Sequence, residues 1–376
     1  MHEIVFPARR LHRILRYADL LAGSEPIHLF LRFFYENGLR GFVGDGTVEA
    51  FFSVKAEVEP FEGAFQLPIP TLKLFLSEKK GEETVRFRFE RGQLLVSVEE
   101  ETLFLQQPTG FRIPKPTPME VVGSFGSSVF LQGVDFSTVV LPPSEKVYFR
   151  EHEGRLFVLS VHDDLFMVFD SGSVSRDFEG AVPYTSIRHL VKAFSALPSS
   201  GLKLSLHPDK SALGFHVPGV FATLPLHPLE PSESAYLLGL LQLPEEMHAL
   251  GQLDVSAFKK SLNKAIRLSR DGRIQMRFEK GQYLLQVEHP GFFYSGAHPM
   301  EAMSDAVFEE PSLSFYAKKI KSSITRFEEG NVSFLSWKGF NGFCDEKREK
   351  WIIFKANTTE RRKNDVRLER TPAGNG

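Results

Sequence analysis

Residues 182–226, with the sequence VPYTSIRHLVKAFSALPSSGLKLSLHPDKSALGFHVPGVFATLPL, predict one helix followed by three antiparallel strands. Pro183 suits the first turn of a helix, where its missing N–H is not needed. Apolar residues then recur at helical spacing, at Ile187, Leu190 and Phe194. A Pro-Ser-Ser-Gly run ends the helix, and three alternating apolar and polar segments follow. Such a unit cannot bury its own apolar face, so we expect further units of the same kind in the chain to pack against it.

Five further segments repeat this pattern along the chain. Candidate helices open at Pro7, Pro70, about Val134, Asp254 and Tyr316, and strand-like alternating segments separate them. The segment near Val134 is short, rich in Val, Ser and Thr, and equally compatible with a strand. Six units pair into three domains of roughly 120 residues, an ordinary domain size. We therefore expect an α+β protein with three repeated domains, each made of two helix-plus-antiparallel-meander units.

Two segments predict where the domains meet. The first is the Pro-rich segment 108–118, and the second, 225–252, is rich in Pro, Glu and Ser around a short apolar piece, YLLGLLQL. Polar and charged residues dominate the end of the chain, which predicts disorder there. The expected domains are 1–117, 118–231 and 232–358, followed by a polar tail at 359–376.

Composition narrows the class of protein. Hydrophobic residues make up 42% of the chain and charged residues 24%, which is typical of a soluble globular protein. The single cysteine, Cys344, excludes an intramolecular disulfide and a multi-cysteine zinc site, and fits a reducing cytoplasm. Arg9 and Arg10 interrupt the N-terminal stretch, so no signal peptide is expected. No apolar run reaches the ~20 residues that span a bilayer, so we expect a cytoplasmic protein with no membrane partner.

The distribution of charge is more informative than its total. The chain has 45 Lys or Arg and 47 Asp or Glu. Five candidate helices nevertheless hold 17 Lys or Arg and only four Asp or Glu. Their apolar residues face one side and their cations the other. The five helices are 7–20, 70–81, 183–196, 254–269 and 316–328.

Ordinary solvation is one reading of these faces, because Lys and Arg are good helix formers. A solvated face, however, normally mixes Glu with Lys, since oppositely charged i,i+4 pairs stabilise a helix. Five helices that nearly exclude acids favour a shared anionic partner, and a phosphate backbone is the obvious one. Without a base-reading motif, binding is expected to be independent of DNA sequence. The cations expected to contact DNA are Arg9, Arg10, Arg13, Arg16, Lys73, Lys79, Lys80, Arg188, Lys192, Lys260, Lys264, Arg267, Lys318 and Lys319.

These features together resemble the bacterial sliding clamp, the β subunit of the replicative DNA polymerase III. Three segments carry the resemblance, which covers about 1–358 and depends on their order and spacing. VPYTSIRHLVKAFSAL is similar to the helix that opens the second half of the clamp's middle domain. LDVSAFKKSLNKAIRLSRDGRIQMRFEKGQYLLQVEHP is similar to the start of its third domain. IPTLKLFLSEKKGEETVRFRFERGQLLVSVEEETLFLQ is similar to the second half of its first domain.

The resemblance implies a processivity factor: a head-to-tail homodimeric ring around duplex DNA, with helices lining the hole and sheets outside. It also implies that DNA polymerase and clamp loader bind through short linear motifs, and that the protein works at the nucleoid. The residues that match the family's dimer interface are Leu103, Leu105, Ile266 and Leu268. Those that match its partner-peptide pocket are Leu165, Phe166, Pro231, Ile352 and Phe354; ordinary core positions remain the alternative for both sets.

Three departures from the family pattern indicate a divergent clamp. The family's Asp-Gly-His-Arg-Leu-like segment stands here as HDDLFM at 162–167. The chain continues past the strand WIIFK, where the family usually ends, into a polar tail that could cover the pocket. The third helix lacks cations.

Catalytic chemistry finds little support in the sequence. His162, Asp163 and Asp164 are the one metal-site candidate, but adjacent residues on a strand point to opposite faces, so turn or strand-end polarity is the preferred interpretation. The other histidines lack the spacing of zinc ligands, and no phosphate-binding glycine loop or nucleophile elbow occurs. We expect no catalytic residue, cofactor or metal. A β-rich multidomain hydrolase resembling a glycosidase, and a non-enzymatic structural scaffold, are the alternatives.

Overall fold

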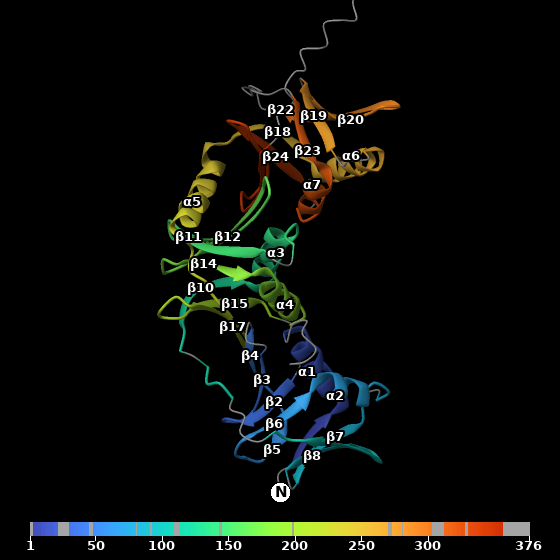
Figure 1. Cartoon of the computed structure of the whole chain (residues 1–376), viewed down its shortest axis with the longest axis vertical. Helices are drawn as coiled ribbons and strands as arrows, with labels where there is room; N and C mark the ends of the chain where they lie inside the picture. The colour runs from blue at the N-terminus through green and yellow to red at the C-terminus, as the bar shows by residue number, and fades with distance from the viewer. Residues whose placement is uncertain are drawn as a thin grey trace, which may run out of the picture. The chain divides into compact units, whose positions relative to one another are not determined.

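The structure is a computed structural model that forms two compact units (Figure 1). Unit 1 comprises Met1–Ser160 and Phe169–Ser234, and unit 2 comprises Val161–Val168 and Ala235–Gly376. The predicted boundaries of three domains stay a prediction. The residues described are 3–21, 30–44, 48–79, 81–90, 92–108, 113–116, 118–142, 145–197, 199–269, 273–279, 281–302, 312–327 and 330–355. The predicted tail, 359–376, lies outside them.

The first half of unit 1 has a helix after one strand, as predicted, and a second helix after five more strands. The residues fold in this way because apolar and polar residues alternate in the strand segments, whereas apolar residues recur every three or four positions in the helix segments. Its elements are β1 (Glu3–Pro7), α1 (Ala8–Leu21), β2 (Phe30–Tyr35), β3 (Leu39–Gly44), β4 (Glu49–Ser53), β5 (Glu57–Val58), β6 (Ala64–Pro68), α2 (Ile69–Phe75), β7 (Thr84–Glu90), β8 (Gln93–Val98) and β9 (Glu101–Gln106).

The second half of unit 1 repeats this order and includes the segment that predicts the fold. The helix expected from Pro183 is α4, and the three alternating segments behind it are strands, as predicted. Pro183 itself is the N-cap residue, just before the first turn. The elements are β10 (Glu120–Gly126), α3 (Ser127–Thr138), β11 (Lys146–His152), β12 (Arg155–His162), β13 (Leu165–Ser173), β14 (Glu179–Pro183), α4 (Tyr184–Ser195), β15 (Gly201–Leu206), β16 (Ala212–Val217) and β17 (Val220–Pro225). The end of β12 and the start of β13, Val161–Val168, belong to unit 2.

Unit 2 contains the last two repeats. Its helix α6 matches the predicted helix 254–269 closely, and α7 is shorter than the predicted 316–328. The elements are α5 (Pro231–Glu246), which begins within unit 1, β18 (His248–Asp254), α6 (Val255–Leu268), β19 (Arg273–Glu279), β20 (Gln282–His289), β21 (Phe292–Pro299), β22 (Glu301–Ala302), β23 (Ser312–Tyr316), α7 (Ala317–Ile324), β24 (Asn331–Trp337), β25 (Phe340–Asp345) and β26 (Lys350–Lys355).

Antiparallel sheets make up the strand layers, which confirms the predicted α+β class. In unit 1 the strands run in the orders β10-β15-β16-β17-β4-β3-β2-β6, β5-β1-β7-β8-β9 and β14-β11-β12-β13. The first sheet joins the two halves of unit 1, because β17 pairs with β4 in a register that sets Val220 opposite Phe52. In unit 2 the orders are β26-β25-β24-β18-β22 and β21-β20-β19-β23.

Phenylalanine fills the space between helices and sheets in both units. In unit 1, Phe6 lies 5.7 Å from Phe33 and 5.6 Å from Phe87 between ring centroids. In unit 2, Phe258 lies 5.3 Å from Phe343. Such aromatic pairs contribute beyond the area that they bury, which explains the 36 phenylalanines of the chain.

Three expectations about elements need correction. The third repeat begins with a full helix, α3, which starts at Ser127 and not near Val134. Its Gly133 lies against the ring of Phe169, where a Cβ would be 2.1 Å from Cε1, so packing selects a glycine there despite its poor helix propensity. The segment 225–252 is not a linker: the 16-residue helix α5 and strand β18 occupy much of it. Helix α2 ends at Phe75, and a turn follows.

Candidate nucleic-acid interface

Helix α1 separates apolar and cationic side chains onto two faces. Leu11, Leu15 and Ala18 are buried against the sheet. Among the described residues, no ion pair joins the cations of the other face to a carboxylate. These exposed cations are Arg9, Arg13 and Arg16. Their charges are therefore available to an external anion.

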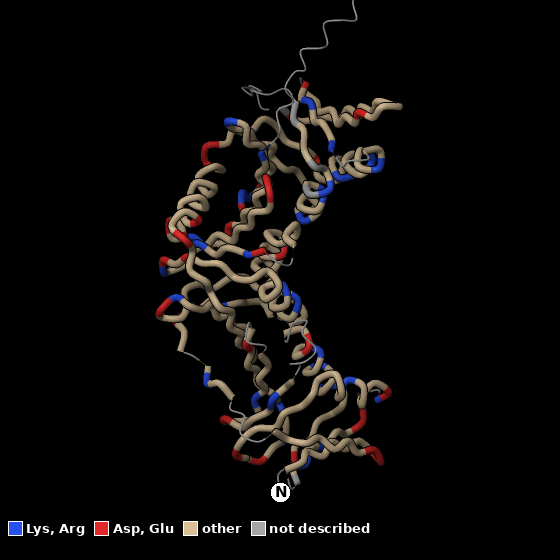
Figure 2. Tube along the Cα trace, in the orientation of Figure 1, with Lys and Arg blue, Asp and Glu red and all other residues tan. Residues whose placement is uncertain are grey.

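Helix α4 continues this cationic surface within unit 1. It contacts α1 on one side and α3 on the other, so α3, α4, α1 and α2 form a row (Figure 1). Arg188 and Lys192 are exposed, and the Arg188 guanidinium lies 5.6 Å from the centroid of the Tyr184 ring. Lys192 is in the last turn, where the helix dipole also favours a cation. Figure 2 shows Lys and Arg positions along α1 and α4 of this row. Helix α3 carries no Lys or Arg.

The cations around α2 are different, because carboxylates of the same chain neutralise them. Lys73 Nζ lies 2.7 Å from Asp19 Oδ2 of α1. Lys79 is only 13% exposed and lies 2.9 Å from Glu101 and 3.4 Å from Glu99. The hydrogen bond to Glu101 raises the pKa of Lys79. Lys80 lies outside the described residues. The cations of α1 and α4 are therefore better placed to contact phosphates than those of α2.

Arg10 points in another direction from the rest of α1. Its guanidinium donates a hydrogen bond to the backbone carbonyl of Lys55, after strand β4. Arg10 therefore lies over the sheet side of the helix, where it lines a pocket with Arg13.

Helix α6 presents a second cationic surface, in unit 2. Phe258, Leu262 and Ala265 are buried, and Asp254 caps the helix by accepting a hydrogen bond of 2.6 Å from the Ala257 backbone N–H. The Lys264 ammonium lies 5.2 Å from the centroid of the Tyr294 ring on β21. The exposed cations on the opposite face of α6 are Lys260, Lys264 and Arg267.

Helix α7 adds an exposed Lys318 to unit 2. The side chain of Lys319, also expected to contact DNA, lies outside those that the structure describes. Ala317, Ile320 and Ile324 are buried, so α7 repeats the division of faces seen in α1.

Of the residues expected at the dimer interface, two lie on a terminal strand and two on a helix. Strand β9 is the last strand of its sheet, with Leu105 buried and Leu103 half-buried. Strand β21 is likewise terminal in unit 2, whose helix α6 carries the half-buried Ile266 and Leu268.

Sequence reasoning did not single out the most exposed aromatic residues at these edges. Phe104 on β9 is 62% exposed, and Phe293 on β21 is 64% exposed. The sequence could have revealed them, because each is an aromatic residue at a solvent-facing position of an alternating strand.

The residues expected to form a partner pocket occupy different environments. Leu165, Phe166, Ile352 and Phe354 are buried in unit 2, whereas Pro231 is exposed at the start of α5. Ile352 and Phe354 lie on β26, and the Phe354 ring lies 5.9 Å from that of Phe343.

Phe166 has an exposed aromatic neighbour that the sequence did not reveal. Its ring lies 6.2 Å from Tyr236 of α5, which is 49% exposed. Tyr236 belongs to a segment that composition marked as a linker, and recognising α5 as a helix would have drawn attention to it.

The one candidate for a catalytic or metal cluster is a turn. His162 ends β12, and Asp163 and Asp164 form the connection to β13, as the turn interpretation predicted. Asp163 has a φ of 53°, a turn conformation that Asp tolerates.

Burial raises the pKa of the Cys344 thiol to about 12, which makes it a poor nucleophile.

The described residues contain no group of three His, Cys, Asp or Glu side chains arranged to hold a metal ion. No helix in the described part of the chain has the length and apolar character needed to cross a membrane.

Comparison with known proteins gives a match in structure and not in sequence. No family model and no curated protein matches the chain. The DNA polymerase III subunit beta of Pseudomonas aeruginosa superimposes with a TM-score of 0.78 at 14% identity, over 95% of this chain and 100% of that one. The beta subunit of Thermotoga maritima gives 0.77 at 11% identity, over 95% and 99%.

A third solved structure agrees with these two. The DNA polymerase sliding clamp of Caulobacter crescentus has a TM-score of 0.77 at 12% identity, covering 94% of this chain and 99% of that one. Nearly the whole chain is therefore matched by nearly the whole of each clamp. The chain has the fold of the bacterial sliding clamp, the DNA polymerase III beta subunit.

Proposed function

We propose that this protein is a DNA sliding clamp, which encircles duplex DNA without sequence preference and tethers a replicative polymerase to it. The observation that carries the proposal is the exposed cations of α1 and α4 in unit 1 and of α6 in unit 2, which form no ion pair with a described carboxylate in a chain whose formal net charge is −2. Lys and Arg spread over helix faces bind phosphates of any DNA sequence. The similarity of the fold to solved DNA polymerase sliding clamps also supports this role.

The salt dependence of DNA binding tests this role of the helices. Each cation that contacts a phosphate should contribute about 0.9 to the slope of log K against log salt. We expect the combined variant Arg9→Ala, Arg16→Ala, Lys192→Ala, Lys264→Ala to flatten that slope by up to about 3.6, whatever the duplex sequence. Fluorescence anisotropy of a labelled duplex over a range of salt concentrations gives the slope.

A matched control removes the same charge from elsewhere on the surface. The four exposed lysines for this control, none of them on a helix, are Lys115, Lys203, Lys338 and Lys347. Replacing all four by Ala should leave the slope unchanged. Equal slopes for the two quadruple variants would show that the helix faces meet only solvent.

Partner recruitment is proposed at the apolar residues around Phe166. We expect Leu165, Phe166, Pro231, Ile352 and Phe354 to contribute to a docking site for apolar motif side chains, with the exposed Tyr236 as its accessible edge. Tyr236→Ala should weaken binding of a fluorescent clamp-binding peptide without unfolding the chain. An unchanged affinity would place partner recruitment elsewhere.

A further inference from the structure

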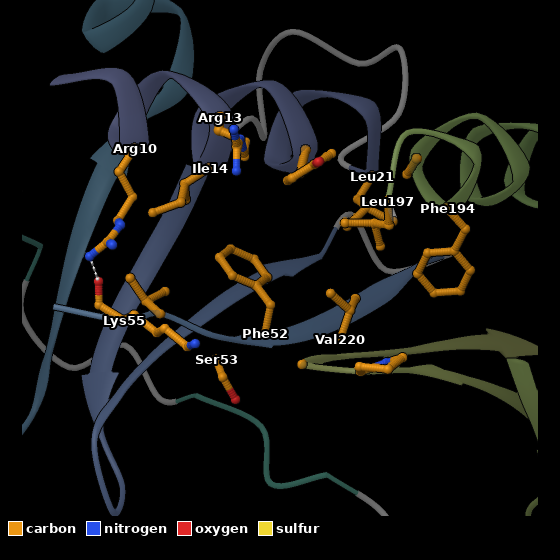
Figure 3. Close-up of a pocket in the computed structure, with 15 residues that line it drawn as sticks. Arg10, Arg13, Ile14, Leu21, Phe52, Ser53, Lys55, Phe194, Leu197 and Val220 are labelled. Atoms are coloured by element: carbon orange, nitrogen blue, oxygen red, sulfur yellow. Dashed lines mark hydrogen bonds between the residues drawn. The ribbon is translucent and has the colours of Figure 1, made fainter. Parts of the chain in front are cut away.

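Unit 1 contains a pocket that shares only Arg13 with the cationic face of α1 and no residue with the expected partner site. It has a volume of 610 Å³ and lies between α1, α4, the end of β4 and the turn that joins β16 to β17 (Figure 3). Ligand sites in proteins commonly measure about 300–1,000 Å³. The pocket is therefore large enough for two or three side chains of a bound peptide.

The position of the pocket follows from how the two halves of unit 1 join. The sheet continues across the join, where the Ser53 backbone N–H donates a 2.8 Å hydrogen bond to the carbonyl of Gly219. The helices meet above the same join, but Ala193 and Val220 are too short to fill the space between helices and sheet. The other apolar side chains that line it include Ile14, Leu21, Phe52, Phe194 and Leu197.

Among the described residues that line the pocket, the charged ones are all cations: Arg10, Arg13 and Lys55. Arg10 donates a hydrogen bond to the Lys55 carbonyl, which holds its guanidinium at one end of the pocket (Figure 3). A guanidinium has five N–H donors, so this bond leaves others for a ligand carboxylate. The pocket thus combines an apolar wall with a positive rim.

We propose that this pocket binds an acidic peptide segment of a partner protein, with one or two large apolar side chains inserted and carboxylates at Arg10, Arg13 and Lys55. Charge complementarity selects carboxylates, since none of the described residues that line the pocket is acidic. The apolar wall selects a peptide over duplex DNA, because a sugar-phosphate backbone gains nothing from contact with Phe52 and Phe194. Arg9 and Arg16, which do not line the pocket, remain available for phosphates.

Three fluorescein-labelled hexapeptides test the proposal by anisotropy titration in the absence of DNA. EEWLEE carries both charge and apolar side chains, EEGSEE carries only the charge, and KKWLKK reverses the charge. We expect saturable binding of EEWLEE and at least about tenfold weaker binding of the other two. Because no DNA is present, the result is independent of whether the protein works as a clamp.

Protein variants then locate the binding. Lys55→Glu reverses an exposed charge of the rim, and Val220→Phe fills the pocket from the sheet side. Each should weaken binding of EEWLEE about tenfold or more, whereas Lys203→Glu, the same change at an exposed position of β15 outside the pocket, should not. Thermal melts of Lys55→Glu, whose side chain is exposed, check that the variant is folded.

Three outcomes would overturn the proposal. Equal affinity for EEWLEE and EEGSEE would reduce it to attraction by surface charge. Unchanged EEWLEE binding by a folded Lys55→Glu variant would place the peptide elsewhere. Weaker DNA binding by Lys55→Glu, with its peptide binding intact, would assign the rim cations to DNA.

Discussion

The neighbours of a cationic residue decide whether its charge can serve a partner. Arg9 and Lys79 were equivalent candidates in the sequence. The structure leaves Arg9 exposed and sets Lys79 against Glu99 and Glu101. Since an ion pair whose carboxylates are exposed contributes little to stability, the pairing of Lys79 matters chiefly because it removes one positive charge from the surface.

The buried side chain of His216 makes the stability of the fold depend on pH. Burial lowers the pKa of His216 below 6.5, with a smaller contribution from Lys203, so the folded chain favours the neutral imidazole. Its Nε2 lies 2.7 Å from Ser205 Oγ, and its ring stacks 4.3 Å from that of Phe221. An unfolded histidine takes up its proton near 6.5. The lowered pKa of His216 therefore stabilises the folded state in full above pH 6.5, and this stabilisation declines as the pH falls through 6.5.

His216→Gln should consequently lose less stability on acidification than the wild type. Urea unfolding midpoints measured on both sides of this pH give the difference. His152→Gln is the control, because it removes a histidine from a strand of another sheet in the same unit. Identical acid sensitivity of His216→Gln and the wild type would show that His216 does not titrate differently in the folded chain.

Among the elements, helices α3 and α5 offer a matched pair of glycines. A Cβ at Gly133 of α3 would lie 2.1 Å from the Phe169 ring, whereas a Cβ at Gly239 of α5 would meet no atom within 4 Å. Gly133→Ala should therefore destabilise the protein by about 1–3 kcal/mol through overpacking. Gly239→Ala should stabilise it by about 0.5–1 kcal/mol, because alanine is the better helix former. A stabilising Gly133→Ala, measured by urea unfolding, would contradict the packing described here.

The elements also show how far the sequence could predict this fold. Periodicity identified α1, α4 and α6, because their apolar residues recur on one face and bury against sheets. The same reasoning missed α5, since its Pro, Ser and Glu residues match the composition of a linker. It placed α3 too late in the chain, because β-branched residues and Gly133 obscure the start of that helix.

Parts of the site that depend on tertiary contacts could not be predicted. Local sequence places Lys79 beside α2 but does not show that Glu101 folds against it. The pocket over the β17–β4 join is likewise created by residues far apart in sequence, such as Arg10, Phe52 and Val220. The exposed cations of α1 and α6 were predictable because they require only a helix with one apolar face.

At the scale of the whole molecule, a ring around DNA requires two copies that join through their sheet edges. An open edge strand with exposed aromatic side chains is suited to pairing with another edge. We propose that β9 of one copy meets β21 of the other, near Leu103, Leu105, Ile266 and Leu268. Two such heterologous contacts would close a ring.

Substitutions at the exposed edge residues test this association. Phe104→Lys and Phe293→Lys should each convert a dimer into a monomer in analytical ultracentrifugation, because both contacts of the ring carry the change. Val129→Lys is the control, since Val129 is 56% exposed but lies on α3 and not on an edge strand. A dimer that survives both edge variants would exclude these strands as the interface.

A ring would hold DNA by encircling it, and the topology of the DNA decides whether this ring exists. The protein is incubated with linear duplex, onto whose ends a closed ring can thread, and the duplex is then ligated into circles. After gel filtration at a salt concentration that abolishes ordinary phosphate binding, we expect the protein to stay with the circles and to leave when a single restriction cut opens them. Equal loss from intact and cut circles, or equal retention on both, would contradict the account.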